Sequence, residues 1–277
     1  MAVGKRWAYY DLADRSPAHT VSGVVFMVRY NQVQSLDLFN MECGRTVSQD
    51  LAEGMCSSNV LRKVVISDSY FHEKFYEILR EEALNCQIEY LWLQFSSRDI
   101  DFLIQSMMGG NLAQWVCAMP HLSTFILSCH YLPDSFILTA ADSPSSCQIR
   151  EITIYSPTEE EEFVSKSAAA KVVSESVAEN LAEFLCRLPH LARAYLTELN
   201  LPEIFFRTIA SQSSRCKVEC IIVDGKPLSE LLTDYQGGAE TPSDGSGSEG
   251  ESSSTDESSH QTGQNSGQEN LQAPHKS

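Results

Sequence analysis

The chain has 277 residues, of which 43% are hydrophobic, so it is long enough for one or two domains with a buried core. Its formal net charge is −17, and seven acidic residues and one basic residue follow position 235. An acidic surface repels phosphate groups, so we expect no nucleic-acid partner and no binding to an anionic membrane surface.

The first 30 residues contain no repeat that can be aligned with the rest of the chain, and we leave this N-terminal segment (1–30) without an assigned structure. The polar residues between Tyr9 and Arg15 interrupt any apolar region that an export signal would need. The sequence has nine cysteines and no Cys-x-x-Cys motif. These features favour a cytoplasmic protein whose cysteines are reduced.

Three stretches of the sequence align without a gap, beginning at Leu51, Leu112 and Leu181, at offsets of 61 and 69 residues. Under these offsets several apolar positions coincide. They are Cys56, Cys117 and Cys186, then Phe75, Phe136 and Phe205, and then Cys86, Cys147 and Cys216. Self-similarity of this kind predicts a stacked repeat architecture.

A shorter template, L-x-x-L-x-L, fits seven times between residues 31 and 235. Its starts are Val33, Leu61, Ile88, Leu122, Ile149, Leu191 and Val218, with a base spacing of 27–28 residues. Positions four and six share one face of a strand. Amphipathic helix patterns follow the strands, as in residues 71–82. We therefore predict an α/β fold over residues 31–235. It is a leucine-rich-repeat solenoid, horseshoe-like, of about seven β-α units, with parallel strands on the concave face and helices on the convex face.

Two phrases in the sequence, LAEFLCRLPHL (181–191) and FHEKFY (71–76), resemble the ribonuclease-inhibitor-like repeats of NOD-like receptors, in the divergent form of invertebrates. The resemblance covers roughly residues 30–230. It implies a sensing arm in innate immunity that lacks the nucleotide-binding domain, because no G-x-x-x-x-G-K-[ST] motif is present. The asparagine that the family places at template position nine is replaced, for example by Met41 and Ser69, so other groups must satisfy the turns.

The sequence contains neither a G-x-S-x-G motif nor an H-E-x-x-H motif. His121 and His190 occupy equivalent repeat positions, which indicates a structural role. The recurring cysteines are best interpreted as small buried hydrophobic residues. We therefore predict no catalytic residue, no metal site and no cofactor, and we expect that the protein is not an enzyme.

Template positions two, three, five and seven are expected to project from the concave face, where aromatic and arginine residues gather. Such residues dominate interface energies. This pattern predicts a binding site for a protein or glycan ligand, although the same aromatics could simply pack against one another across strands. The candidate ligand-binding residues are Tyr90, Trp92, Tyr155, Tyr195, Arg62, Arg150 and Arg193.

Residues 236–277 form an acidic Ser/Gly-rich tail that lacks the apolar residues needed for folding, and we predict that it is disordered. It is either an inert solubilising tail or a phosphorylated one, with candidates Ser246, Ser248, Ser253 and Ser254. Two functions stay open for the whole chain. One is innate-immune recognition of NOD-like-receptor type, and the other is an intracellular leucine-rich-repeat adaptor or inhibitor scaffold, that is, a substrate receptor or an enzyme inhibitor.

Overall fold

The computed structural model of the chain describes residues 7–11, 17–95, 109–129, 132, 134–142, 144–156 and 173–233. The chain divides into one compact unit, Met1–Ala239, and a second, Glu240–Ser277. The predicted tail (236–277) and its four candidate phosphorylation sites lie outside the described residues. All of the described residues belong to the first unit.

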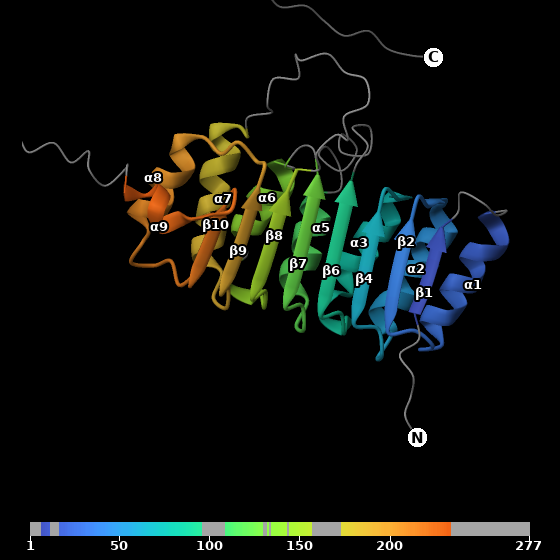
Figure 1. The fold of residues 1–277 in the computed structure, drawn as a ribbon. Coiled ribbons are helices and arrows are strands. Elements are labelled where there is room, and N and C mark those ends of the chain that lie inside the picture. Colours follow the sequence, from blue (N-terminus) through green and yellow to red (C-terminus); the bar gives the residue numbers. More distant parts are fainter. Residues whose placement is uncertain are drawn as a thin grey trace, which may run out of the picture. The chain divides into compact units, whose positions relative to one another are not determined.

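One sheet runs through the described part of the first unit, and its strands follow one another in the order of the chain (Figure 1). Every neighbouring pair from β1 to β10 is parallel, and β11 adds antiparallel to β10. The strands are β1 (Trp7–Asp11), β2 (Ser35–Phe39), β4 (Lys63–Ser67), β6 (Tyr90–Phe95), β7 (Thr124–Cys129), β8 (Glu151–Tyr155), β9 (Arg193–Thr197), β10 (Cys220–Val223) and β11 (Lys226–Pro227). A second, two-stranded sheet pairs β3 (Glu42–Cys43) with β5 (Tyr70–Phe71).

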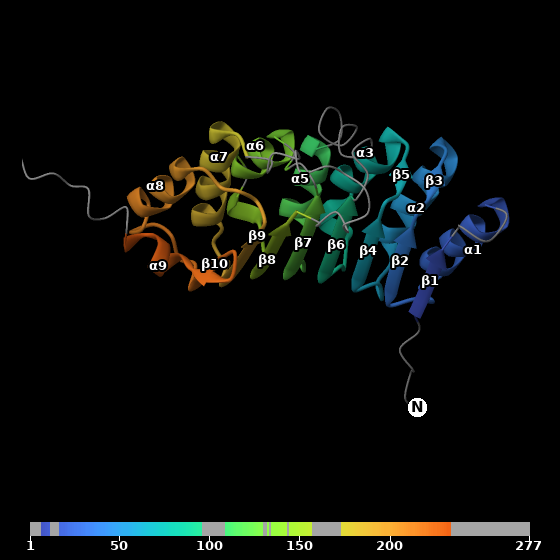
Figure 2. The same ribbon diagram turned by 45° about the horizontal axis from the view of Figure 1, so that its top comes forward.

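Helices connect the parallel strands, because adjacent parallel strands require a crossover. From α1 to α8 each described helix contacts the next described one, so these helices form a second layer. Figures 1 and 2 show this layer on one side of the sheet. The helices are α1 (Pro17–Arg29), α2 (Arg45–Ser57), α3 (Glu73–Glu81), α5 (Gly109–Ala118), α6 (Asp134–Asp142), α7 (Glu175–Arg187), α8 (Glu203–Ser211) and α9 (Leu228–Leu231), with short 3-10 turns η1 (Ala83–Asn85) and η3 (Pro144–Ser146). The predicted α/β class with parallel strands is confirmed.

The predicted burial of template positions four and six is confirmed at all seven template matches. In β6, Leu91 and Leu93 are buried, whereas Tyr90 and Trp92 are half-buried and project to the other face. The residues at template positions four and six are buried in every strand from β2 to β10. The core therefore lies between the sheet and the helix layer.

The helix patterns follow the same logic. In α3, Phe75, Ile78 and Leu79 are buried on the face toward the sheet. The helix begins at the predicted region because His72 accepts a hydrogen bond at Nδ1 from the backbone N–H of Lys74, at 3.2 Å, and so caps its first turn.

The N-terminal segment, for which the sequence predicted no structure, contains a further β-α unit. β1 pairs in parallel with β2, and α1 packs against α2, so the repeat begins before residue 31. The register places Ala8 and Tyr10 opposite Leu36 and Leu38. Tyr10 stands where the template requires an aliphatic residue at position six, and Lys5 stands at position one, so the template does not match this unit.

The turns that lack the family's asparagine ladder are satisfied by other side chains. Ser69 accepts a hydrogen bond at Oγ from the backbone N–H of Met41 (3.1 Å) and donates to the carbonyl of Ser67 (2.8 Å). Farther along, the Asp224 carboxylate accepts from the N–H of Glu198 (2.7 Å). Each side chain bridges two neighbouring turns, which is the task that the asparagine would perform.

Phe136 and Leu138 on α6 provide a matched test of the one-sided core. Phe136 is fully buried and stacks on Phe125, with ring centres 5.8 Å apart, whereas Leu138 is 46% exposed. We expect Phe136→Ala to cost about 3–5 kcal/mol and to lower the melting temperature by roughly 10 °C. Leu138→Ala should change stability by less than about 0.5 kcal/mol. Thermal unfolding followed by circular dichroism checks both values, and equal effects of the two substitutions would contradict this packing.

Candidate functional site

The sheet has a second face that no described helix covers, and we call it the open face. Figures 1 and 2 show the helices from α2 to α8 together on the other side of the sheet. Its side chains come from template positions three, five and seven of each strand. These residues are mostly half-buried rather than buried, in contrast to the inner face of the same strands.

Position five forms a continuous line across seven neighbouring strands, from Asp37 of β2 to Ile222 of β10. We call its six members from β4 to β10 the central row. The pairing register sets its members side by side. Strands lie about 4.8 Å apart, so the row is about 24 Å long from end to end. Most of its side chains are apolar or aromatic. In order, the row consists of Val65, Trp92, Ile126, Thr153, Tyr195 and Ile222.

A polar row, formed by position three, runs beside the central row. The Lys63 ammonium lies 5.0 Å from the centre of the Tyr90 ring, a cation–π contact. Arg193 forms an ion pair with Glu151 on the neighbouring strand, with N and O 3.6 Å apart. Its pKa is raised, first by a hydrogen bond to Tyr195. The cations of this row therefore already have partners across the strands.

Five of the seven predicted ligand-binding residues lie on the open face. They are Tyr90 and Trp92 of β6, Tyr155 of β8, and Arg193 and Tyr195 of β9. Burial raises the pKa of the Tyr90 hydroxyl, with Tyr155 as the next cause. The predicted residues thus fall into a connected region instead of scattering over the sheet.

Arg62 and Arg150 differ from the other five because each precedes its strand. The Arg62 guanidinium donates hydrogen bonds to the carbonyls of Asn59 (3.0 Å), Leu61 (3.2 Å) and Gln87 (3.4 Å) and pairs with Glu89 at 3.2 Å. Its donors are committed to the local turns, which indicates a structural role. Arg150 is exposed, and its carbonyl accepts the N–H groups that start the next strand.

Sequence reasoning missed the aliphatic members of the central row. Val65, Ile126 and Ile222 occupy the same template position as Trp92. The sequence-based prediction considered aromatic and arginine residues as ligand-binding candidates and therefore did not include these aliphatic residues. Reading the whole of position five as one line would have found them.

Four polar atoms on the open face are buried and have no hydrogen-bond partner within the described part of the chain. They are Ser35 Oγ, Asp37 Oδ1, Trp92 Nε1 and Ser128 Oγ. Burial raises the pKa of Asp37, and the nearby Lys63 lowers it by a smaller amount. Unsatisfied buried polar groups cost stability, so this face is not optimised for the stability of the fold alone.

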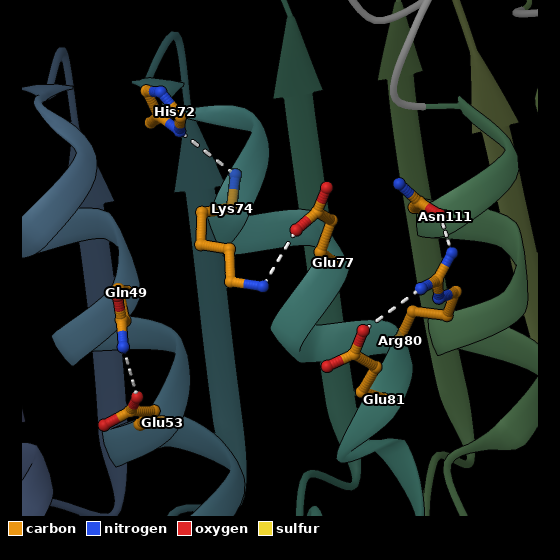
Figure 3. A network of polar contacts seen from close by, with 8 residues as sticks. All are labelled: Gln49, Glu53, His72, Lys74, Glu77, Arg80, Glu81 and Asn111. Carbon is orange, nitrogen blue, oxygen red and sulfur yellow. Dashed lines mark hydrogen bonds and ion pairs between the residues drawn. The ribbon is translucent and has the colours of Figure 1, made fainter.

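The helix layer carries a separate open groove of about 880 Å³ between α2 and α3. Its two cationic lining residues are both paired. Arg29 contacts Glu53 at 2.7 Å, and Lys74 contacts Glu77 at 2.9 Å. Figure 3 shows Lys74 in contact with Glu77 and, separately, Arg80 in contact with Glu81 and with Asn111 of α5. The groove is also lined by Glu81 and Glu82, so its lining holds more acidic than basic residues.

All nine cysteines lie in the described part of the chain, and seven of them are buried, whereas Cys216 and Cys220 are partly exposed. Among the described residues no cluster of three or more metal-binding side chains occurs. None of the described helices is both long and apolar enough to cross a bilayer.

Comparison with known proteins provides no family for this chain. No family model matches its sequence, and no curated protein matches it. Among solved structures, the C-terminal domain of tropomodulin from Caenorhabditis elegans aligns with 79% of this chain and 98% of its own, at 11% identity and a TM-score of 0.33. An aldolase, QR15, aligns with 84% of this chain and 95% of its own, at 9% identity and a TM-score of 0.23. Similarity this low carries no argument about function.

Asp37 tests whether a buried polar group on the open face lowers the stability of the fold. An acid whose pKa is raised by folding destabilises the protein when it ionises, so its penalty appears as the pH rises above the ordinary value near 4. Asp37→Asn should therefore raise the melting temperature at pH 7 and have a smaller effect at pH 3.5. The exposed Glu42 on β3, changed to Gln, is the control for the loss of one negative charge. If Asp37→Asn raised the melting temperature equally at both pH values, the result would contradict the burial of the Asp37 carboxylate.

Proposed function

We propose that this protein is a non-enzymatic interaction module that binds a protein ligand on the open face of its sheet. The observation behind the proposal is the central row, a line about 24 Å long of apolar and aromatic side chains that no described helix covers. Aromatic and arginine residues at the centre of a desolvated patch supply most of the energy of protein interfaces.

The architecture we propose is a leucine-rich-repeat solenoid. Strand–helix units recur at a base spacing of 27–28 residues, and each strand pairs with the strand of the next unit. Ser69 satisfies the backbone of the turn where such repeats place asparagine. A solenoid of this type offers its strand face as an extended binding surface.

The shape and chemistry of the open face favour a protein over a glycan. Ile126 and Ile222 are half-buried and present aliphatic surface, which complements apolar side chains. The cations beside them, Lys63 and Arg193, already have partners. A ligand therefore gains mainly from burial of apolar area, which is the usual source of energy in protein association.

Two biological settings suit such a module, and the resemblance of the sequence to NOD-like receptors favours the first. It is innate-immune recognition inside the cell by the sensing arm of a receptor. The second is a cytoplasmic adaptor or inhibitor scaffold. The first implies a microbial ligand and the second a host protein, so the origin of the ligand separates them.

The double variant Trp92→Ala/Tyr195→Ala tests the site. Both side chains are half-buried, so we expect the fold to lose little stability. The affinity for the ligand should fall at least 100-fold, because each truncation of a hot-spot residue costs about 2 kcal/mol or more of binding free energy. The control is Tyr70→Ala, an exposed aromatic on β5, away from the open face. The unchanged protein, the double variant and the Tyr70→Ala control are immobilised. The measurement is the amount of host cytosolic protein, and separately of bacterial surface material, that each of them captures.

A photo-crosslinking amino acid provides the second readout. Placed at Thr153 in the central row it should crosslink to the captured protein, whereas at the exposed Leu84 on the helix side it should not. Capture that survives the double variant, or crosslinks only from Leu84, would refute the assignment of the open face. A captured bacterial component supports the receptor reading, and a host protein supports the adaptor or inhibitor reading.

A further inference from the structure

The structure places six of the nine cysteines in three pairs that repeat along the chain. Each pair joins residues 30 positions apart. The first member lies in the last turn of α2, α5 or α7, and the second lies just before β6, β8 or β10. The pairs are Cys56 with Cys86, Cys117 with Cys147, and Cys186 with Cys216.

In the first pair the sulfur atoms face each other, with the Sγ atoms of Cys56 and Cys86 3.0 Å apart. The other two pairs hold the equivalent positions of their units, and in each pair the two thiols shift one another's pKa. A disulfide needs its two sulfurs about 2 Å apart, with their β-carbons directed toward each other. The thiols are therefore already placed for bond formation with little movement.

The three pairs differ in access to solvent. The four thiols of the first two pairs are 0–2% exposed. In the third pair Cys186 is buried, but Cys216 is only partly buried and follows α8 in an exposed turn. Thiol–disulfide exchange requires that an attacking thiolate reach the sulfur of its partner molecule. Only the third pair combines an accessible thiol with a neighbouring thiol behind it.

The interaction within this pair also favours reaction at Cys216. The pKa of Cys216 is lowered to about 6, first by the neighbouring Cys186 thiol, although partial burial raises it. The pKa of Cys186 is raised, so this thiol keeps the shared proton. Cys216 is therefore the nucleophile and Cys186 the thiol that reacts second.

We infer that Cys186 and Cys216 form a reactive dithiol site that is converted to an intramolecular disulfide by low-molecular-weight disulfides. The Cys216 thiolate attacks one sulfur of RS–SR, which forms a Cys216–SR mixed disulfide and releases RS⁻. Cys186 then loses its proton to solvent and attacks the Sγ of Cys216, which releases the second RS⁻. The protein dithiol is oxidised, and RS–SR is reduced to two RSH molecules.

The bond would close the chain around β9 and α8, because both elements lie between the two cysteines. A closed loop of this length restricts the unfolded chain and so stabilises the folded one. The modification therefore acts on the C-terminal part of the sheet, where α7 would be linked covalently to the turn that leads into β10. This inference does not depend on the proposed function of the open face.

The experiment treats the full chain with oxidised glutathione under native conditions, then alkylates the remaining thiols and maps peptides by mass spectrometry. We expect a peptide linked through Cys186 and Cys216 to appear first, with a mass loss of about 2 Da for the intact protein. The melting temperature should rise by several degrees. The four thiols of the other pairs should become alkylatable only after unfolding in urea.

Variants make the order of steps visible. Cys186→Ser should retain one glutathione on Cys216, because the resolving thiol is missing, and Cys186→Ala repeats the test if serine impairs folding. Cys216→Ser should show neither the mixed disulfide nor the link. Cys220→Ser removes the other partly exposed thiol and should behave like the unchanged protein.

Three outcomes would overturn the inference. The first is a folded protein in which both thiols stay alkylatable after treatment. The second is a stable glutathione adduct on Cys216 in the unchanged sequence. The third is a link between Cys216 and Cys220, or within one of the buried pairs, that forms before the link between Cys186 and Cys216.

Discussion

Backbone hydrogen bonding between strands that follow one another in the chain is the constraint on which the rest of this structure depends. Parallel pairing of each strand with its predecessor obliges the chain to return through a helix every time. From α1 to α8 the described helices pack side by side, each against the next described one. One face of the sheet is therefore filled by the core, and the other is left without a helical cover.

This one-sided arrangement separates the requirements on neighbouring residues of the same strand. Leu91 and Leu93 must be large and apolar because they fill the space beneath the helices. Tyr90 and Trp92, which alternate with them on the open face, meet no such requirement. The unsatisfied Nε1 of Trp92 and Oδ1 of Asp37 are consistent with a surface that is under pressures other than folding stability.

The same stacking explains the cysteine pairs. The last turns of α2, α5 and α7 and the segments before β6, β8 and β10 recur at the same spacing of 30 residues. Wherever both positions hold cysteine, two thiols meet, as Cys56 and Cys86 do. The pairs differ only in how much protein covers them, and the end of the stack, where Cys216 lies, is the least covered. A repeated geometry thus gives one pair a distinct chemical property through its position.

The sequence by itself determined the strand positions, the inward-facing residues and the α/β class, because burial on one face imposes a strict two-residue alternation that residues such as Leu36 and Leu38 record directly. It failed for β1, where Ala8 and Tyr10 do not carry that signal although backbone pairing suffices to add the strand. Only the tertiary structure decided which side chains share a row, that Arg62 is engaged by its own turns, and that cysteines 30 residues apart are neighbours. These facts depend on the register between units, which sequence spacing with insertions does not specify.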